Sequence, residues 1–310
     1  ALTGTPIENS LAELWSIFDF LMPQYLYNYH HFKETYEIPI IKNEDQEKQA
    51  KLKRFVEPFI LRRTKKDVLT ELPDKIENNV LIPFTPDEEK VYLANLSTIN
   101  TELQSAIQVN HIDKIQILAM MTRLRQLCCD QRILYNNVQE PSSKLKACMD
   151  IIETAKENEQ KILLFSSFTK SLDLIEAELR KKDISYYVLT GATTKIKRHQ
   201  LVNAFQNDKT TVFLISLKAG GTGLNLTSAS TVIHFDPWWN MSAQNQATDR
   251  AYRIGQTNNV QVYKLIMKNS IEEKIQKLQE QKQDLSNMFI ENNHGSITQM
   301  STADIIDLFK

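Results

Sequence analysis

The chain has 310 residues, of which 42% are hydrophobic and 24% are charged, and its formal net charge is -1. These values fit a globular protein long enough for two hydrophobic cores, so we expect two lobes. A net charge near zero excludes a uniformly basic surface of the kind that coats nucleic acid. Any polyanion would therefore have to bind to local basic patches.

The cysteines and the apolar segments exclude two further classes of protein. Cys128, Cys129 and Cys148 match neither a Cys-x-x-Cys metal pair nor an even disulfide framework. No apolar run is long enough to span a membrane, and no charged start precedes an apolar signal core. We therefore expect an intracellular protein that is not secreted, in the cytoplasm or nucleoid of a bacterium or in a nucleus.

The first residues predict the end of a strand followed by a polar turn. The sequence has no initial Met and enters directly into Leu2 to Pro6, so we expect a fragment of a longer protein. Ser10 to Glu13 is a capping-box pattern that opens an amphipathic helix. Residues 51–66 carry seven Lys and Arg against one Glu. This basic patch indicates an anion contact, with a solvated basic face as the alternative.

From Thr85 onward the pattern becomes helical. Thr85, Pro86 and Glu88 supply an N-cap, a proline in the first turn and an acid three residues after the cap. Apolar residues at helical spacing then predict two long helices joined near residues 109–113, which we interpret as a helical protrusion. Three arginines near its far end are interpreted as a solvated face: Arg123, Arg125 and Arg132.

After residue 141, short apolar strands alternate with helices. We place the strands at residues 161–165, 186–189, 211–215, 231–235 and 260–266. This alternation predicts the α/β class, with a parallel sheet and helices on its faces. In such open sheets, ligands bind where the strands end and the loops begin.

Three of these loops have the chemistry of anion sites. Hydroxyls in Ser166 to Thr169 and small residues in Thr190 to Thr194 and Ser216 to Asn225 favour phosphate binding by side chains and backbone amides. For the first loop, N-capping of the next helix is the alternative. The candidate phosphate contacts are Ser166, Ser167, Thr169, Gly191, Thr193, Lys218, Gly220, Gly221, Thr222 and Asn225. Because these loops follow successive strands and have similar chemistry, we expect them to bind one extended anion together.

Other kinds of catalytic site find no support in the sequence. No glycine-rich loop ends in Gly-Lys-Ser/Thr, so there is no Walker loop, and the dinucleotide fingerprint is also missing. No pair of histidines has metal-ligand spacing, so we assign no metal ligand. A Ser/His/Asp arrangement cannot be proposed from these residues.

Residues 246–256 place two arginines close together. The run is compatible with a helix that stops at Gly255, and Arg250 and Arg253 would then lie on one face, where two guanidinium groups can bind one anion. Asp249 stands four residues before Arg253, the favourable order for a helical ion pair. A solvated, salt-bridged surface helix is the alternative.

In their order along the chain, these segments resemble the Swi/Snf-type family of ATP-dependent DNA translocases within helicase superfamily two. Leu2 to Asn9 resembles the third helicase motif, and Pro58 to Lys65 resembles the block after it. Ser166 to Lys170 resembles the fourth motif, Lys218 to Leu226 the fifth, Phe235 to Asn240 the tryptophan motif and Gln246 to Gln256 the sixth. The resemblance runs from Leu2 to about Ile290.

The resemblance implies two RecA-like lobes. Residues 1–70 would hold the C-terminal end of the first lobe with a helical and basic segment, and residues 71–140 a helical protrusion and linker. Residues 141–268 would form the second lobe, and residues 269–310 a brace helix and tail. ATP with Mg would be bound mainly by the missing part of the first lobe. We therefore expect the intact protein to be a DNA-dependent ATPase and this chain alone to be inactive.

The resemblance also implies roles for single residues. Arg250 and Arg253 would be arginine fingers that stabilise the transferring phosphoryl group. The nucleotide site would be supported by Gln246, Asp249, Gln256 and Gly223, and hydrolysis would be coupled to movement by Thr3, Gly4, Thr5 and Trp239. The candidate phosphate contacts would follow one strand of double-stranded DNA.

Several alternatives stay open. The isolated chain could be a DNA- or protein-binding module without catalysis, and the intact protein a strand-separating helicase or a polymerase-recycling helicase-like ATPase. Met241 stands where the family often has proline, and Tyr252 where histidine is frequent, which leaves the subfamily open. The adjacent Trp238 and Trp239 argue against the polymerase-recycling branch. No membrane partner is expected.

Overall fold

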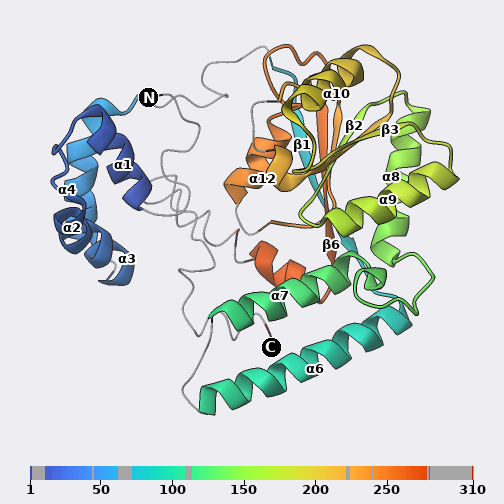
Figure 1. The fold of residues 1–310 in the computed structure, drawn as a ribbon, viewed down its shortest axis with the longest axis horizontal. Coiled ribbons are helices and arrows are strands. Elements are labelled where there is room, and N and C mark those ends of the chain that lie inside the picture. The colour runs from blue at the N-terminus through green and yellow to red at the C-terminus, as the bar shows by residue number, and fades with distance from the viewer. Residues whose placement is uncertain are drawn as a thin grey trace. The chain divides into compact units, whose positions relative to one another are not determined.

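The chain folds into two compact units. The computed structural model describes residues 1, 11–43, 45–61, 72–108, 114–220, 224–238, 241–277, 279 and 309. Unit 1 comprises Ala1–Glu71 with Gln281–Ser296, and unit 2 comprises Leu72–Glu280 with Ile297–Lys310. Among the described residues, unit 1 has one buried apolar cluster and unit 2 has two. Figure 1 shows the helices of unit 1 and the sheet and helices of unit 2.

All secondary-structure elements among the described residues of unit 1 are helices. Its elements are α1 (Leu11–Leu21), α2 (Tyr29–Phe32), the π-helix η1 (Lys33–Glu37), α3 (Ile38–Asn43), α4 (Gln46–Val56) and the 3₁₀ helix η2 (Glu57–Phe59). Local caps define two of the starts, because Asn28 accepts from the backbone N–H of His31 and Asp45 accepts from that of Lys48. Most of the apolar face predicted for the first helix is buried: Leu11, Leu14 and Phe18 lie in the core and Trp15 packs against it, whereas Leu21 is exposed.

Unit 2 is built on a six-stranded sheet in which all strands are parallel, as predicted for the α/β class. The strands are β1 (Lys75–Ile82), β2 (Ile162–Ser166), β3 (Tyr186–Leu189), β4 (Val212–Ser216), β5 (Thr231–His234) and β6 (Val260–Met267). Their order in space is β1-β6-β5-β2-β4-β3. Five of the six correspond to the strands expected from short apolar runs, with boundaries that differ by one residue at most.

Strand β1 was not predicted, because residues 71–140 were expected to form a helical protrusion and linker. It pairs with β6 in parallel from Lys75 opposite Val260 to Ile82 opposite Met267. Its sequence is Lys-Ile-Glu-Asn-Asn-Val-Leu-Ile, and most of its side chains are exposed or half-buried. An edge strand of this kind carries a weak hydrophobic pattern, and Asn and Glu are disfavoured in strands.

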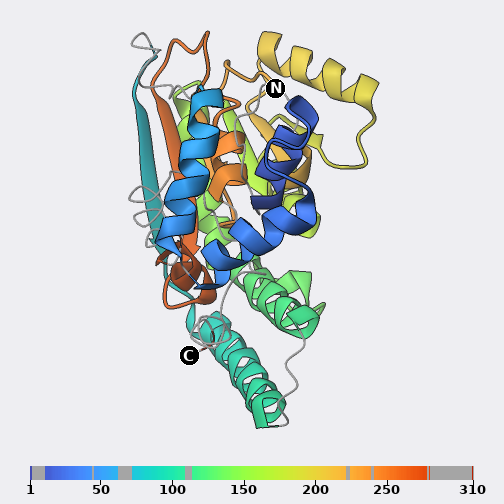
Figure 2. The same ribbon diagram turned by 90° about the vertical axis from the view of Figure 1, so that its left-hand side faces the viewer.

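Helices cover both faces of the sheet (Figures 1 and 2). They are α6 (Pro86–Gln108), α7 (Lys114–Cys129), the 3₁₀ helix η3 (Gln131–Ile133), α8 (Ser143–Glu157), α9 (Thr169–Lys181), α10 (Lys195–Asn207), α11 (Leu217–Gly220) and α12 (Met241–Thr248). Alternate side chains of β2 point to opposite faces, because Ile162 and Leu164 join the cluster with α8 and α9, whereas Leu163 and Phe165 join the cluster with α10 and α12.

The predicted pair of long helices forms a hairpin, α6 and α7, beyond the carboxyl ends of the strands. Its expected capping box is confirmed: Glu88 accepts from the Thr85 N–H at 2.7 Å, and Thr85 Oγ1 accepts from the Glu88 N–H at 3.3 Å. Glu88 also accepts from the Ser143 N–H at 2.8 Å, and the Tyr92 hydroxyl accepts from the Ile271 N–H at 2.8 Å. These bonds attach the base of the hairpin to the sheet and its helices.

Candidate nucleic-acid and nucleotide site

The strand register brings the three candidate phosphate loops to one edge of the sheet. Ser166 at the end of β2 lies opposite Ser216 at the end of β4, and Leu189 at the end of β3 lies opposite Ile215. β2, β4 and β3 are neighbours in the sheet. The loops that follow them therefore start side by side, as the parallel-sheet argument predicts.

The first loop divides into an inward and an outward part. The Ser166 side chain is buried, and its hydroxyl donates to Asp236 Oδ1 at 2.6 Å. The Ser167 N–H donates to the same oxygen at 3.0 Å. Thr169, the first residue of α9, is exposed. Ser166 and the backbone of Ser167 thus anchor the loop to Asp236, whereas the third candidate, Thr169, faces solvent.

The second loop is shaped by threonine caps. Thr194 is the N-cap of α10, with its hydroxyl accepting from the Lys197 N–H, and Thr193 Oγ1 accepts from the Thr190 N–H at 3.1 Å. Gly191 is exposed, and a Cβ added to it would meet no heavy atom within 4 Å. The side chain of Lys197 is also exposed, so this loop offers an open backbone next to positive charge.

The third loop is described only in part. Lys218 lies in the short helix α11 and is exposed, Gly220 ends this helix, and Asn225 is exposed. Several predicted residues lie outside the described residues: Gly221, Thr222 and Gly223 in this loop, and Thr3, Gly4, Thr5 and Trp239 elsewhere.

The prediction that a helix runs on to Gly255 is wrong. α12 ends at Thr248, and residues 249–255 form turns. The Arg250 carbonyl, which would accept from residue 254 in a continuing helix, accepts instead from the Leu226 N–H at 2.9 Å. Gly255 has a φ of 99°, in the left-handed region that favours glycine. The two arginines therefore sit on a turn, and the helical i,i+4 relation between Asp249 and Arg253 does not apply.

The turn is held by Gln256, which has its side chain buried. Its amide Nε2 donates to the Ala229 carbonyl at 2.8 Å and to that of Ala251 at 3.2 Å. Its Oε1 accepts from the N–H groups of Thr257 and Asn258, both at 3.0 Å. Gln256 thus uses its donor and acceptor on the backbone, and it fixes the shape of the arginine turn, defined here as residues 249–255.

The arginine turn concentrates positive charge. Arg250 is half-buried and Arg253 is exposed. Burial lowers the pKa of Arg250 below its usual value, and the charge of Arg253 lowers it further, while Asp249 acts in the opposite direction. An anion bound between two guanidinium groups offsets their mutual repulsion and accepts hydrogen bonds from both. Gln246, on α12, is half-buried and lies in the turn of helix before Asp249 and Arg250.

The arginine turn and the phosphate loops lie at opposite ends of the strands. The turn contacts residues 226–229, which precede β5, and the Lys75 amino group at the start of β1 lies 6.0 Å from the centre of the Tyr252 ring. α12 begins after the carboxyl end of β5 and returns toward the amino end beside the sheet (Figure 1). Its eight residues span about 12 Å.

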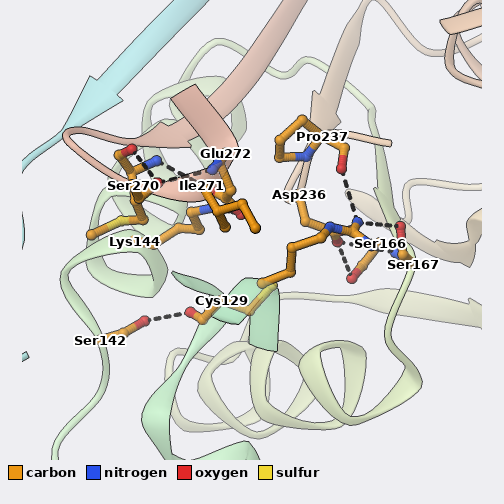
Figure 3. A network of polar contacts seen from close by, with 12 residues as sticks. Cys129, Ser142, Lys144, Ser166, Ser167, Asp236, Pro237, Ser270, Ile271 and Glu272 are labelled. Carbon is orange, nitrogen blue, oxygen red and sulfur yellow. Dashed lines mark hydrogen bonds and ion pairs between the residues drawn. The ribbon is translucent and has the colours of Figure 1, made fainter. Parts of the chain in front are cut away.

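Two buried ion pairs at the carboxyl edge were not predicted. Arg125 was interpreted as part of a solvated face, yet it is 3% exposed and pairs with Asp236 at 3.1 Å. Lys144 and Glu272 are both fully buried, with Nζ to Oε1 at 2.7 Å (Figure 3). Burial acts to lower the pKa of Lys144, but the charge and hydrogen bond of Glu272, together with Cys129 and Cys128, leave this pKa above its usual value. Removing one partner of such a pair typically costs about 3–5 kcal/mol.

The neighbours of Arg125 in the sequence indicate that its side chain is buried. It is flanked by Leu124 and Leu127, which are buried with Cys128 and Cys129. A single Arg inside an apolar helical stripe has to find a buried partner, but the partner lies 111 residues later in the chain. Among the described residues, no group of three or more His, Cys, Asp or Glu could hold a metal ion, and no helix is long and apolar enough to cross a membrane.

Two family models match consecutive segments of the chain. Residues 1–133 match the SNF2-related domain, and residues 143–255 match the helicase conserved C-terminal domain. The chain covers 98% of the Sulfolobus solfataricus SWI2/SNF2 ATPase C-terminal domain at 31% identity and a TM-score of 0.61, with 76% of its own length. The chain belongs to the SWI2/SNF2 ATPase family.

Further relatives are similar over almost the whole chain. The S. solfataricus ATPase core in complex with dsDNA is 37% identical, with a TM-score of 0.63, over 99% of this chain and 66% of that one. An uncharacterized ATP-dependent helicase of Mycoplasma pneumoniae is 39% identical over 100% of this chain, and the putative ATP-dependent helicase/translocase YwqA of Bacillus subtilis is 38% identical over 100%. The chain spans 29% and 34% of these two relatives.

Proposed function

We propose that the intact protein is an ATP-dependent motor that moves along double-stranded DNA. In this proposal, the chain supplies contacts to the DNA backbone and two arginines that act on the nucleotide. The observation that carries it is the alignment of three polar loops at the ends of β2, β4 and β3. The SWI2/SNF2 core from S. solfataricus, which is similar over 99% of this chain, binds dsDNA in its solved complex, and this supports the choice of ligand.

The chemistry of the loops fits phosphates rather than bases. Thr169, Gly191 and Lys218 are exposed and offer a hydroxyl, an open backbone and an ammonium group. Such groups position a protein on the duplex and carry no direct sequence information. We therefore expect DNA binding that does not depend on sequence and weakens strongly with salt. Gly220, Gly221, Thr222 and Asn225 belong to the same proposed surface.

The arginine turn fits the role of arginine fingers. When bound, ATP with Mg supplies the phosphoryl group and the metal that neutralises charge on its oxygens, and both would be held mainly by a part of the protein outside this chain. Arg250 and Arg253 would stabilise the charge of the transferring group, while Gln256 keeps their turn in shape. Gln246, Asp249 and Gly223 are proposed to support the same site, and Thr3, Gly4, Thr5 and Trp239 to couple it to movement.

The experiment that tests this function is ATP turnover by the intact protein on defined DNA. Double strands of increasing length and single strands of equal length are added at saturating concentration. We expect turnover to rise with duplex length until a plateau is reached and single strands to stimulate poorly. Stimulation by single strands as strong as that by duplex would instead identify a strand-separating helicase.

A further inference from the structure

Arg125 connects the helical hairpin to two loops at the carboxyl edge of the sheet. It lies on α7, and its Nη2 donates to Asp236 Oδ2 at 3.1 Å, to the Pro237 carbonyl at 2.9 Å and to Ser167 Oγ at 3.4 Å. Figure 3 shows these partners, Asp236, Pro237 and Ser167, converging with Ser166. One guanidinium group thus contacts the segments that follow β2 and β5.

Asp236 is the second centre of this network. It accepts from the Ser166 hydroxyl at 2.6 Å and from the Ser167 N–H at 3.0 Å and 3.3 Å, in addition to its bond with Arg125. The Arg125 and Asp236 side chains are 4% and 0% exposed, so water does not screen the pair. The backbone of the loop before α9 is therefore attached to a carboxylate that is neutralised from α7.

Aromatic rings hold the guanidinium group from two segments. Its central carbon lies 5.1 Å from the centre of the Phe168 ring and 5.4 Å from that of the Trp238 ring. A planar guanidinium can contact ring faces and donate to several acceptors at once, whereas a lysine ammonium is a compact charge on a flexible stem. These contacts suit an arginine and not a lysine. The guanidinium group of Arg125 contacts two segments, residues 167–168 and residues 236–238.

We propose that Arg125 is a positioning residue for DNA binding. It does not touch DNA; it fixes the loop of residues 166–169, so that Thr169 and the first turn of α9 face the phosphates, and it orients Trp238 beside this loop. The proposal rests on the proposed function for the role of Thr169. It also makes the α6/α7 hairpin part of the DNA-binding machinery, because the hairpin carries the residue that sets the loop.

The first test measures the loop without DNA. In the intact protein, amide hydrogen exchange is followed at Ser167, which donates to Asp236, and at Phe168, which donates to Ser166 Oγ. In Arg125→Lys we expect exchange at these two amides to become about tenfold faster, while amides within β2 and at Thr193 keep their rates. Arg123→Lys is the matched control, since Arg123 lies two residues away on α7 and its guanidinium donates to Asn95 and Tyr135 instead of to the loop.

Two results of this test would overturn the proposal. One is unchanged exchange at Ser167 and Phe168 in Arg125→Lys. The other is an equal increase at every amide of the sheet, which would mean that Arg125 only stabilises the fold. Arg125→Met removes the charge and should have the larger effect; if it does not fold, Arg125→Lys decides alone.

The second test uses duplex affinity and a pair of variants. Thr169→Ala should weaken binding several-fold in the wild-type background and by a clearly smaller factor in Arg125→Lys, because the loop is already displaced. Lys197→Ala, on α10, should cost the same factor in both backgrounds. Equal costs of Thr169→Ala in both backgrounds would contradict the positioning role. If Thr169→Ala has no effect in the wild type, the DNA role of Thr169 fails, and the exchange experiment still decides what Arg125 does to the loop.

Discussion

His234 is buried at the end of β5 in a setting that keeps its ring neutral. Burial lowers its pKa to about 3, and the charges of Lys264 and Lys75 add to this effect against that of Glu77. The ring nitrogen Nε2 lies 2.9 Å from Thr248 Oγ1 at the end of α12, and the ring stacks on Phe165. This residue therefore connects β5 to the helix that precedes the arginine turn.

We expect the free energy of unfolding to decrease as pH falls below 6.5. The folded pKa of about 3 lies below the ordinary value of 6.5, so the unfolded chain takes up the proton first and gains stability relative to the fold. Between pH 6.5 and 4.5 the loss approaches about 1.4 kcal/mol per pH unit for this one group. Denaturant unfolding at several pH values measures it. His234→Gln, which cannot take up this proton, should lose less stability over the same range, and equal slopes in both proteins would contradict the assignment.

The two arginines of the turn are expected to act on turnover rather than on DNA binding. Arg250→Ala or Arg253→Ala in the intact protein should lower ATP turnover by a factor on the order of 10³, as loss of an arginine finger does, and leave duplex affinity nearly unchanged. Turnover at saturating DNA and a duplex binding titration measure the two effects separately.

Lys197→Ala is the crossed control for the arginines. Lys197 is exposed on α10, near the phosphate loops and away from the arginine turn. This variant should weaken duplex binding and leave turnover at saturating DNA close to the wild-type value. If Arg250→Ala and Arg253→Ala weaken DNA binding as strongly as they lower turnover, these arginines are phosphate contacts.

At the scale of an element, the loop between β3 and α10 offers a position, Gly191, where a substitution can block the approach of a ligand without destabilising the fold. A Cβ at Gly191 meets nothing within 4 Å, so Gly191→Ala should change the free energy of unfolding by less than about 1 kcal/mol. If the DNA backbone lies against this loop, duplex affinity should fall with Ala and fall further with Met. Asn203→Met, exposed later on α10, is the control for a bulky side chain. Unchanged affinity in Gly191→Met would remove this loop from the DNA surface.

The elements also explain how far the sequence predicts the fold. Strands β2 to β6 were found because buried strands in a parallel sheet are short apolar runs, as in Ile162 to Ser166. Edge strand β1 lacks this pattern. The end of α12 was misplaced because Gln246 to Gly255 contains no strong helix breaker before its glycine, and the contacts that end the helix come from Leu226 and Ala229. Long-range contacts of this kind leave no local mark in the sequence; the apolar neighbours of Arg125 indicate that it is buried, but not that Asp236 is its partner.

At the scale of the whole molecule, unit 2 carries two candidate anion sites on one sheet. The phosphate loops follow the carboxyl ends of β2, β4 and β3, and the arginine turn lies toward the amino ends of β5 and β6. Between them run β5 and α12, joined by the bond between His234 and Thr248. The two candidate sites are therefore spatially separate, so we expect duplex binding by the chain alone to be measurable without nucleotide.

The isolated chain is expected to bind duplex DNA without hydrolysing ATP. The sequence contains no Gly-Lys-Ser/Thr loop to hold the phosphates of ATP, while unit 2 carries the candidate phosphate loops on a sheet with its own core. Turnover of the purified chain should equal the background with or without DNA, and ATP should leave its duplex affinity unchanged. The affinity itself should fall with salt on a log–log scale, with a slope of about -0.9 for each phosphate contacted. The intact protein is the positive control for turnover. Measurable hydrolysis by the chain alone would mean that a nucleotide site exists within these 310 residues and that the arginine turn does not depend on a partner lobe.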